Sequence, residues 1–580
     1  MRYLRMFTNA LAGGVLTALY LGVLVLQLNP QVSIASATAL GWFGALLAMY
    51  GPYVTVLITL AILGGEAIVS RPLYPGWLSV RILAWLSAAS SATAAALTWA
   101  NLEGMRSVLS VEAATRMREG ATATTVCAVV LAVVVILRYS FGRRRNRPAA
   151  LLMVTSVLAS LLVPVGLRGP GELKVPATRR INQARPVGLP PRVRIMLIDG
   201  ASRGFILQRV AAGQLPNFGK LIDRGAIIDL ATLRPTQAEP VWTAAATGKY
   251  PPKNGARSEF VYRVSDGDAD PVDLLPDYCF AQALLYQGFV RAEPLTATAR
   301  RARPMWDILA DYGVPSGIVN WPLTRPADGA FGFLISDYFD EATSSPIRSG
   351  DLKAGDPTTA VDIAREVFDR WQQAPWTEVL PTVSPSDPRL AGIRRARWDR
   401  AYAEAAVELT RWFAPRLTAL RLEGVDEFGH AFLRDAETEL IGGARQVATE
   451  RSPLDRYYAY LDSQLELAIA QTEPGDLLLV VSGFGMERTP LVKRLLARLL
   501  GERDITGSHE AAPDGFLLAY GTHVHPGEYR RGSVVDLAPT VLYYMGLPIG
   551  RDMDGFARTD LFRVTYTHEH PVTYTLTHER

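Results

Sequence analysis

Five apolar segments fill the first 168 residues, and they constrain the fold more than any other feature of the chain. They span residues 8–28, 35–69, 79–100, 121–138 and 149–167. Four of them are close to the roughly 20 residues that a helix needs to cross a bilayer. The whole chain is 49% hydrophobic and only 20% charged, which is too apolar for one soluble globule. The sequence therefore predicts an α-helical transmembrane domain over residues 1–168, followed by a soluble part.

The second segment is too long for one ordinary crossing, and Gly51-Pro52 interrupts it near its middle. It forms either one long kinked helix or two short helices. Arg2 and Arg5 precede the first segment, and GRRRNR at 142–147 separates the fourth from the fifth. Positively charged loops stay on the cytoplasmic side. Both basic clusters lie inside only if the second segment crosses once, which predicts five crossings and an exported C-terminal domain.

This topology predicts a multi-pass protein of the inner or plasma membrane, with a periplasmic or extracellular soluble domain. The helices serve either as an anchor or as a transport or lipid-binding bundle, and no span carries the acidic or histidine pair that an ion path needs. The expected partners are the lipid bilayer and other membrane-protein subunits. The net charge of +4 includes no long basic run, so nucleic acid is not an expected partner. Cys127 and Cys279 are the two cysteines and suggest no disulfide framework.

The soluble part alternates apolar strands with helical segments. Residues 169–191 are rich in Gly, Pro and Arg and form a linker. Alternation from residue 192 onward predicts an α/β domain over 192–562, with a mostly parallel sheet and helices on both of its faces. Residues 256–400 show fewer clear strands and are assigned to an inserted cap. Residues 563–580 form a C-terminal tail.

Candidate metal ligands follow three of the predicted strands. Asp199 ends the first strand, Asp426 and His430 follow LTALRLEG with the spacing D-x-x-x-H, and His509 lies in GSHEAAPDGF. Two imidazoles and a carboxylate are a typical ligand set for zinc or a similar divalent ion. The competing interpretation is that these side chains only pack in the fold and bind no metal.

Taken together, the segments resemble the alkaline phosphatase superfamily, most closely its type I phosphodiesterase/nucleotide pyrophosphatase branch. The resemblance runs from about Val193 to Phe562. It rests on the first strand with Asp199-Gly200 and, in order, on LPNFGKLIDRGA, PVWTAAATGKYPP, VDEFGH, VVSGFGM, GSHEAAPDGF and VVDLAPTVLYYMGLPIGRDMDG. It implies an alkaline-phosphatase-like sheet with an inserted cap.

The resemblance also implies a two-metal site that clamps a phosphate and activates a Ser or Thr nucleophile. One metal of such a site is held by an aspartate and two histidines, and Asp426, His430 and His509 match all three. The second is held by the aspartate of the first strand, matched by Asp199, by the nucleophile and by an Asp-His pair of a Ser-Asp-His-Gly-Met motif.

Several positions of that second site carry the wrong residue. The Asp-His pair falls on Gly483 and Phe484, and the nucleophile falls on Ala238. The histidine of a further His-Gly pair is replaced by Asn254. Ala238 cannot form a phosphoryl-enzyme bond, and Thr236, the nearest hydroxyl, is expected to point elsewhere. One zinc-like ion therefore fits the sequence, and no second metal is expected.

The losses predict a membrane-anchored pseudoenzyme that acts as a binding or structural subunit of a membrane complex, with a phosphate or a lipid headgroup as candidate ligand. The alternative is an active phosphodiesterase or phosphatase in which a single zinc-like ion at Asp426, His430 and His509 activates a water. The tail, RVTYTHEHPVTYTLTHER, carries His568, His570 and His578. It forms either a metal-binding tail or, in better agreement with its alternating pattern, an added edge strand or a partner-binding tail.

Overall fold

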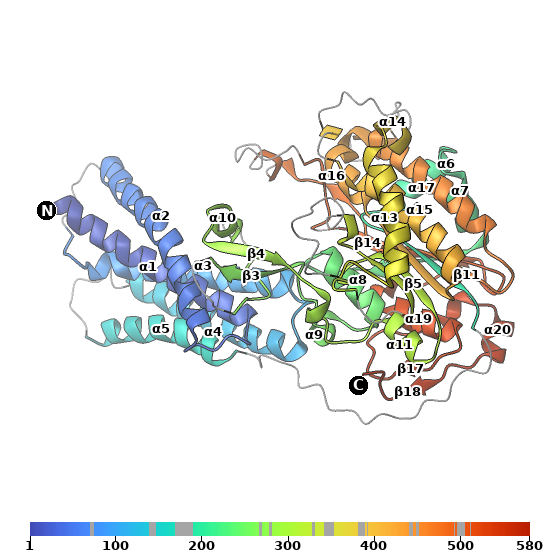
Figure 1. Ribbon diagram of the computed structural model, residues 1–580. Coiled ribbons are helices and arrows are strands. Elements are labelled where there is room, and N and C mark those ends of the chain that lie inside the picture. The colour runs from blue at the N-terminus through green and yellow to red at the C-terminus, as the bar shows by residue number, and fades with distance from the viewer. Residues whose placement is uncertain are drawn as a thin grey trace. The chain divides into compact units, whose positions relative to one another are not determined.

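The computed structural model describes residues 1–69, 75–137, 147–168, 190–265, 270–277, 281–327, 331–340, 353–380, 389–390, 393–439, 445–447, 452–491, 493–495, 505–510 and 512–579. The chain divides into two compact units (Figure 1). The helical unit contains Met1–Val175 together with Arg257–Pro294. The sheet unit contains Pro176–Ala256 and Leu295–Arg580.

Five helices from the N-terminal half build most of the helical unit. They are α1 (Arg2–Leu28), α2 (Ala37–Val69), α3 (Val80–Gly104), α4 (Val111–Val135) and α5 (Arg147–Gly166). Within the described residues, α1 to α4 are long and apolar enough to cross a membrane, and the apolar part of α5 is shorter, at 151–166. The second apolar segment forms one helix, α2, with Pro52 inside it. The helices support membrane association.

Polar contacts tie the N-terminal end of the bundle together. Arg2 forms an ion pair of 2.8 Å with Glu66, so the start of α1 lies beside the end of α2. The Asn9 side chain donates to the Gly76 carbonyl oxygen and accepts from the Ser79 amide. These contacts make α1 and α2 antiparallel neighbours, and they satisfy polar groups that would otherwise be buried without partners.

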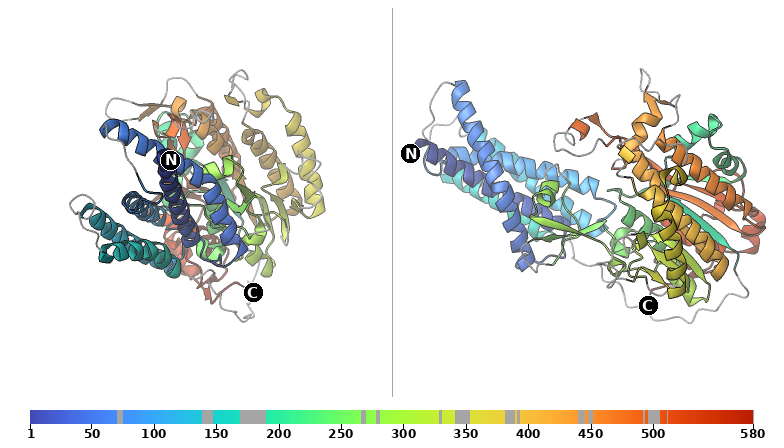
Figure 2. Two further views of the ribbon diagram at one scale, coloured as in Figure 1. Left: turned by 90° about the vertical axis from the view of Figure 1, so that its left-hand side faces the viewer. Right: turned by 45° about the horizontal axis from the view of Figure 1, so that its top comes forward.

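Residues 257–294 group with the helices and not with a cap of the soluble domain, which differs from the assignment of 256–400 to one cap. They form β3 (Phe260–Val264), α10 (Ala281–Tyr286) and β4 (Val290–Pro294), and the two strands pair as an antiparallel hairpin beside the helices (Figure 2). The reason is burial, because Val272, Leu284 and Val290 pack into one cluster with side chains of α1 and α2. Residues 295–400 also differ from a separate cap, since they supply three strands of the main sheet.

Polar groups at the loop end of α1 bind the same segment. Asn29 accepts from the amides of Asp273 and Leu274, each at 3.0 Å, and donates to the Leu274 carbonyl oxygen at 2.7 Å. Asn101 of α3 accepts from the Asp277 amide at 2.6 Å. Both asparagines are fully buried. Residues 257–294 are therefore an integral part of the helical unit.

The sheet unit alternates strands and helices along most of its length. Its elements are β1 (Val193–Ile198), α6 (Arg203–Ala211), α7 (Pro216–Arg224), β2 (Ala226–Ala231), α8 (Ala238–Thr247), α9 (Pro251–Asn254), α11 (Met305–Asp311), β5 (Ser316–Trp321), β6 (Gly332–Ser336), β7 (Gly355–Asp356), α13 (Thr358–Gln373), α14 (Trp376–Val379), α15 (Arg395–Phe413), β8 (Leu417–Leu422), α16 (Gly424–Ala436), β9 (Glu437–Glu439), β10 (Arg445–Val447), α17 (Pro453–Ala470), β11 (Leu477–Phe484), β12 (Glu487–Arg488), β13 (Gly507–Ser508), β14 (Asp514–Tyr520), β15 (Gly527–Glu528), β16 (Gly532–Ser533), α19 (Leu537–Tyr544), β17 (Ile549–Gly550), α20 (Val564–Glu569) and β18 (Tyr574–Thr575).

The main sheet is mixed, with a parallel centre. Its order among the described strands is β15-β2-β14-β11-β1-β8-β5-β6-β7, with β16 also paired to β2. The pairs from β11 through β1, β8 and β5 to β6 are parallel, whereas β14 runs antiparallel to both β11 and β2. The carboxyl ends of the parallel strands therefore share one edge, which is where open α/β sheets place their ligands.

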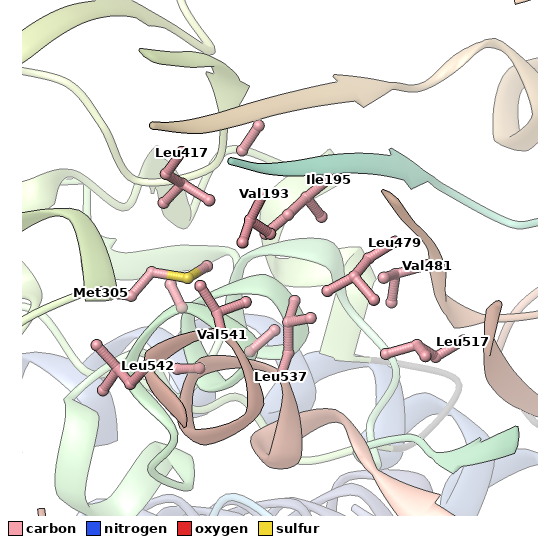
Figure 3. Close-up of a cluster of buried hydrophobic side chains, with 14 of the residues drawn as sticks. Val193, Ile195, Met305, Leu417, Leu479, Val481, Leu517, Leu537, Val541 and Leu542 are labelled. Carbon is pink, nitrogen blue, oxygen red and sulfur yellow. The ribbon is translucent and has the colours of Figure 1, made fainter. Parts of the chain in front are cut away.

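Alternate side chains of the central strands belong to hydrophobic clusters on opposite faces of the sheet. Val193 and Ile195 of β1 join Leu479 of β11 in a cluster with α8, α11 and α19 (Figure 3). Met196 and Ile198 of β1 enter a second cluster with α7, α16 and α17. Each strand is thus buried on both sides, as its continuous apolar sequence predicts. The predicted fold class is confirmed.

The C-terminal tail forms the helix α20 and the two-residue strand β18. Residues of β18 pair with β17 in parallel. His578 is buried, with its Nε2 at 2.8 Å from the Pro548 carbonyl oxygen. Glu579 forms an ion pair of 2.7 Å with Lys249. Among the described residues, the tail histidines join no cluster of metal-ligating groups. The tail therefore adds no strand to the main sheet, because β17 and β18 form a separate two-stranded sheet, and metal binding by the tail stays a prediction.

Candidate functional site

One helix and one loop bring three metal-ligating side chains together at the carboxyl edge of the sheet. Asp426 and His430 lie one turn apart on α16, so they share a helix face. The loop after β13 supplies His509. His430 Nε2 is 3.5 Å from Asp426 Oδ2, and His509 Nε2 is 3.9 Å from Asp426 Oδ1. One ligand atom from each of the three residues lies within 4.8 Å of the others, and all three side chains are half-buried.

The backbone orients both imidazoles toward this point. His430 Nδ1 lies 2.8 Å from the Gly507 carbonyl oxygen, and His509 Nδ1 lies 3.1 Å from the Thr236 carbonyl oxygen. A carbonyl only accepts, so each Nδ1–H donates, and in the neutral form of the ring each Nε2 then has a lone pair for a ligand. Asp426 Oδ1 is buried and finds no hydrogen-bond partner among the described residues. An unpaired carboxylate oxygen between two imidazole lone pairs fits a divalent cation.

Asp199 has a different surrounding, because an arginine occupies the place beside it. Arg421, on the neighbouring strand β8, donates to Asp199 Oδ2 from Nε at 2.9 Å and from Nη2 at 2.5 Å. The Trp242 indole of α8 donates to Asp199 Oδ1 at 2.6 Å. Asp199 is 2% and Arg421 5% exposed. Both oxygens of Asp199 are thus occupied by protein donors, and this position does not fit a second metal ion.

The ion pair continues into a buried network. Arg421 Nη1 is 3.3 Å from Glu423, and Glu423 is 3.5 Å from Arg395. Burial raises the pKa of Asp199, and Arg421 opposes that rise. Burial alone would raise the pKa of Glu423, but Arg421 and Arg395 outweigh it and lower that pKa. The pKa of Arg421 itself is raised, since Asp199 and Glu423 outweigh its burial. The guanidinium therefore stays charged and serves as the permanent cation at this position.

Gly483 and Phe484 end β11 without offering a ligand. A Cβ on Gly483 would overlap the Val241 side chain and lie 3.4 Å from the Trp242 ring. Phe484 is 1% exposed, and its ring centroid lies 5.1 Å from that of His509. Apolar side chains of α8 and β11 therefore fill the space that an Asp-His pair would need.

Ala238 begins α8 and lies between Thr236, which contacts His509, and Trp242, which contacts Asp199. Thr236 presents its carbonyl oxygen to His509, while its hydroxyl donates to the Leu233 carbonyl oxygen at 2.9 Å and points elsewhere, as expected. Asn254 lies apart from these contacts. Its amide donates to the Lys249 carbonyl oxygen and accepts from the Ala256 amide, so both polar groups serve the local turn.

A buried carboxyl holds the start of the ligand-bearing helix. Asp399 of α15 accepts from the backbone amides of Glu423 at 3.0 Å and Gly424 at 2.7 Å, and the Tyr457 hydroxyl donates to it. Acceptors at a helix N-terminus satisfy its free amides. Burial raises the pKa of Asp399 from its ordinary value of 3.8 to about 7. Asp399 thereby positions α16, which carries Asp426 and His430.

This raised pKa predicts a pH dependence of stability. Because the folded protein holds the proton more tightly than the unfolded chain, the stabilisation is present below the ordinary value of 3.8 and is lost as the pH rises to about 7. Asp399→Asn, which cannot ionise, is expected to flatten the change in unfolding temperature between about pH 4 and about pH 8. The exposed Asp369→Asn should keep the wild-type dependence. Equal slopes for all three proteins would contradict the role of Asp399.

A cavity of about 490 Å³ opens beside the site without including its ligands. Apolar side chains such as Phe205, Leu433 and Met486 line much of it. Its three acidic residues are paired with arginines, because Asp229 pairs with Arg203, Asp514 with Arg531 and Glu437 with Arg488. None of the candidate site residues lines this cavity, so the candidate chemistry and this cavity are separate features.

Sequence reasoning missed Arg421, Trp242 and Asp399. For Arg421 a signal exists in LTALRLEG, where one charged residue interrupts an apolar strand. A charge in a buried strand requires a partner of opposite sign. Asp199, at the end of another buried strand, is such a partner. No comparable signal marks Trp242 or Asp399, whose roles depend on contacts far apart in sequence.

The pattern of the type I phosphodiesterase / nucleotide pyrophosphatase family matches residues 193–529. No curated protein matches the chain in sequence. Among solved structures, murine ectonucleotide pyrophosphatase/phosphodiesterase 5, an inactive variant in complex with AMP, is 13% identical, with 64% of this chain and 100% of that chain covered and a TM-score of 0.37. Phosphonoacetate hydrolase from Sinorhizobium meliloti, in complex with phosphonoacetate, is 16% identical, with coverages of 56% and 65% and a TM-score of 0.32.

Proposed function

This chain belongs to the type I phosphodiesterase/nucleotide pyrophosphatase family of the alkaline phosphatase superfamily, and we propose that it is a membrane-anchored pseudoenzyme of that family. In this role the sheet unit binds a ligand or a partner subunit and does not turn over a phosphodiester. The helices anchor it in a membrane complex. Phosphate or a lipid headgroup is the ligand chemistry that such a site would retain.

The ion pair between Arg421 and Asp199 carries this proposal. Two-metal hydrolysis needs a second dication beside the nucleophile. Here the one remaining ligand of that ion is bound to a guanidinium, and Ala238 offers no nucleophile. A guanidinium supplies positive charge but no open coordination position. Arg421 therefore neutralises Asp199 in place of the second metal ion, but the site lacks that ion and the nucleophile that hydrolysis needs.

A second candidate function rests on Asp426, His430 and His509. The unpaired Asp426 Oδ1 and the two Nε2 atoms fit one zinc-like ion. Bound there, the ion would supply Lewis-acid activation of a water or a phosphate oxygen. The alternative to the pseudoenzyme is thus a hydrolase with a single ion. Phe484, which packs against His509, leaves no imidazole or carboxylate on that side to accept a proton.

The metal content of the protein tests whether the first metal site binds an ion and the second does not. The purified full-length protein is expected to retain close to one zinc per chain, measured by elemental analysis after dialysis. Loss of one of only three ligands weakens zinc binding strongly, so His430→Ala and His509→Ala are each expected to lose most of it. His568→Ala, an exposed histidine of α20, serves as the matched control and should keep it.

Two results would contradict this assignment. Two ions per chain would mean that Arg421 leaves room for the second metal. Zinc retained by His430→Ala and His509→Ala, or absent from the wild type, would mean that the three side chains only pack together.

For the anchor we propose a multi-pass topology with the N-terminus inside. Residues 257–294 lie between the two parts of the sheet unit in sequence and pack at the Asn29 end of α1, opposite the Arg2–Glu66 end. This arrangement supports an exported sheet unit in an inner or plasma membrane.

Cysteine labelling tests this topology in a variant lacking the native cysteines. A cysteine replacing Trp412, which is 69% exposed, is expected to react with a membrane-impermeant maleimide on intact cells. A cysteine replacing Tyr3, 64% exposed at the N-terminus, should react only after the membrane is permeabilised. The reverse pattern would refute the orientation.

A further inference from the structure

Residues 278–290 read YCFAQALLYQGFV and contain no charged side chain, although Asp277 and Arg291 flank them. A run of 13 uncharged, mostly apolar residues is too short to span a bilayer, and runs of this length occur in buried or interfacial segments. The structure describes residues 281 onward, where α10 begins. The run belongs to the segment that packs on the helical unit.

Part of this segment is buried against the helices, whereas residues 286–288 are exposed. Leu284 and Val290 lie in a cluster with Leu21 and Val25 of α1 and with Tyr50 of α2. Tyr286 is 85% exposed.

The contact with α2 fixes the depth of the segment along the bundle. Gln287 donates to the Tyr53 hydroxyl at 2.9 Å. Tyr53 precedes Glu66 by 13 residues, or about 20 Å of helix. Glu66 and Arg2 form a charged pair, and we place one boundary of the hydrocarbon layer at this pair because charges are costly inside it. Since that layer is about 30 Å thick, Tyr53 lies about 10 Å inside its opposite boundary.

The neighbouring surface of α2 supports the same depth. Val56, Leu57 and Leu60 follow Tyr53 within two turns and are 54%, 65% and 58% exposed. These side chains must face lipid if α2 crosses the membrane. Tyr286 is the neighbour in sequence of Gln287, which contacts Tyr53 at the start of this apolar surface.

The exposed residues of α4 indicate where the hydrocarbon layer ends. Its first turns expose Glu112, Arg116, Arg118 and Glu119, whereas its large exposed side chains from Val126 onward are apolar. A charged helix surface of this kind lies outside the hydrocarbon layer. The segment around α10 carries no such charges.

We propose that residues 281–287 insert into the bilayer without crossing it, in the leaflet opposite the Arg2–Glu66 end, with lipid as their partner. The proposal rests on the membrane anchor described above. Tyr286 reaches the interfacial region, where tyrosine is favoured because its ring is apolar and its hydroxyl is wet. The family domain thus contributes a membrane-inserted element of its own, in addition to the N-terminal helices.

Fluorescence quenching by spin-labelled lipid tests the proposal in the full-length protein. The native Cys127 and Cys279 are replaced by alanine, and single cysteines replace Tyr286, Leu57 or Thr115. Each is labelled with a small environment-sensitive dye in phosphatidylcholine nanodiscs carrying a nitroxide on the acyl chain. The Leu57 position reports the lipid-facing side of α2, and Thr115, exposed among the charges of α4, reports water.

The label at Tyr286 is expected to lose most of its fluorescence, as the label at Leu57 does, while the label at Thr115 stays bright. A bright label at Tyr286 beside a quenched label at Leu57 would overturn the proposal and leave the anchor intact. Bright labels at all three positions would refute the anchor itself.

Discussion

Arg421→Met is expected to lower the free energy of unfolding by about 3–5 kcal/mol, the cost of leaving one buried charge without its partner. The substitution removes the guanidinium, whereas the Asp199 carboxylate, which is 2% exposed, stays buried without it. Glu423 loses a neighbour as well. Thermal unfolding of the full-length protein in detergent measures the loss as a lower unfolding temperature.

Two further variants separate the ion pair from a general loss of packing. Asp199→Leu combined with Arg421→Met removes both charges and is expected to recover much of the lost stability, since a buried pair can be exchanged for apolar side chains at little cost. Arg411→Met, an exposed arginine of α15, should change stability by less than about 0.5 kcal/mol. If Arg421→Met matched Arg411→Met, the ion pair would have no structural role.

Rebuilding the family residues is expected to leave the protein inactive. The triple variant Ala238→Ser, Gly483→Asp and Phe484→His restores the residue types of the nucleophile and of the two missing ligands. In the structure, Arg421 still holds Asp199, and any side chain at position 483 overlaps Val241. No second metal can bind while both obstacles remain. Hydrolysis of an aryl phosphodiester should therefore stay at the level of the buffer blank.

A broader variant shows which obstacle matters. Adding Arg421→Ala and Val241→Ala to the triple variant frees Asp199 and opens the space beside position 483. Uptake of a second zinc ion by this variant, and not by the triple variant, would attribute the block to these two side chains. Turnover by the triple variant alone would contradict the account of the second site.

Local spacing predicted the part of the site that one helix determines. Asp426 and His430 are four residues apart, so α16 alone places them on one face. Asp199 directly follows the first predicted strand, Val193 to Ile198. Both positions depend on the chain within a few residues, which is why the sequence was enough.

The replacement of the second metal could not be predicted in the same way. It depends on the register Leu197↔Arg421 between β1 and β8, which brings an arginine beside Asp199 across 222 residues of chain. The sequence predicted the missing ligands at Gly483 and Phe484 but not the cation that replaces the ion. The place of residues 257–294 was missed for a similar reason, because Leu284 and Val290 are buried only by α1 and α2.

The central claim is that the family chemistry does not run in this chain, and turnover of a generic aryl phosphodiester by the zinc-loaded, full-length protein tests it most directly. The wild type and His430→Ala are measured side by side at equal concentration. The account predicts the same rate for both, at the level of the buffer blank. Robust wild-type turnover that His430→Ala or His509→Ala abolishes would contradict the account and identify the protein as a hydrolase with a single ion.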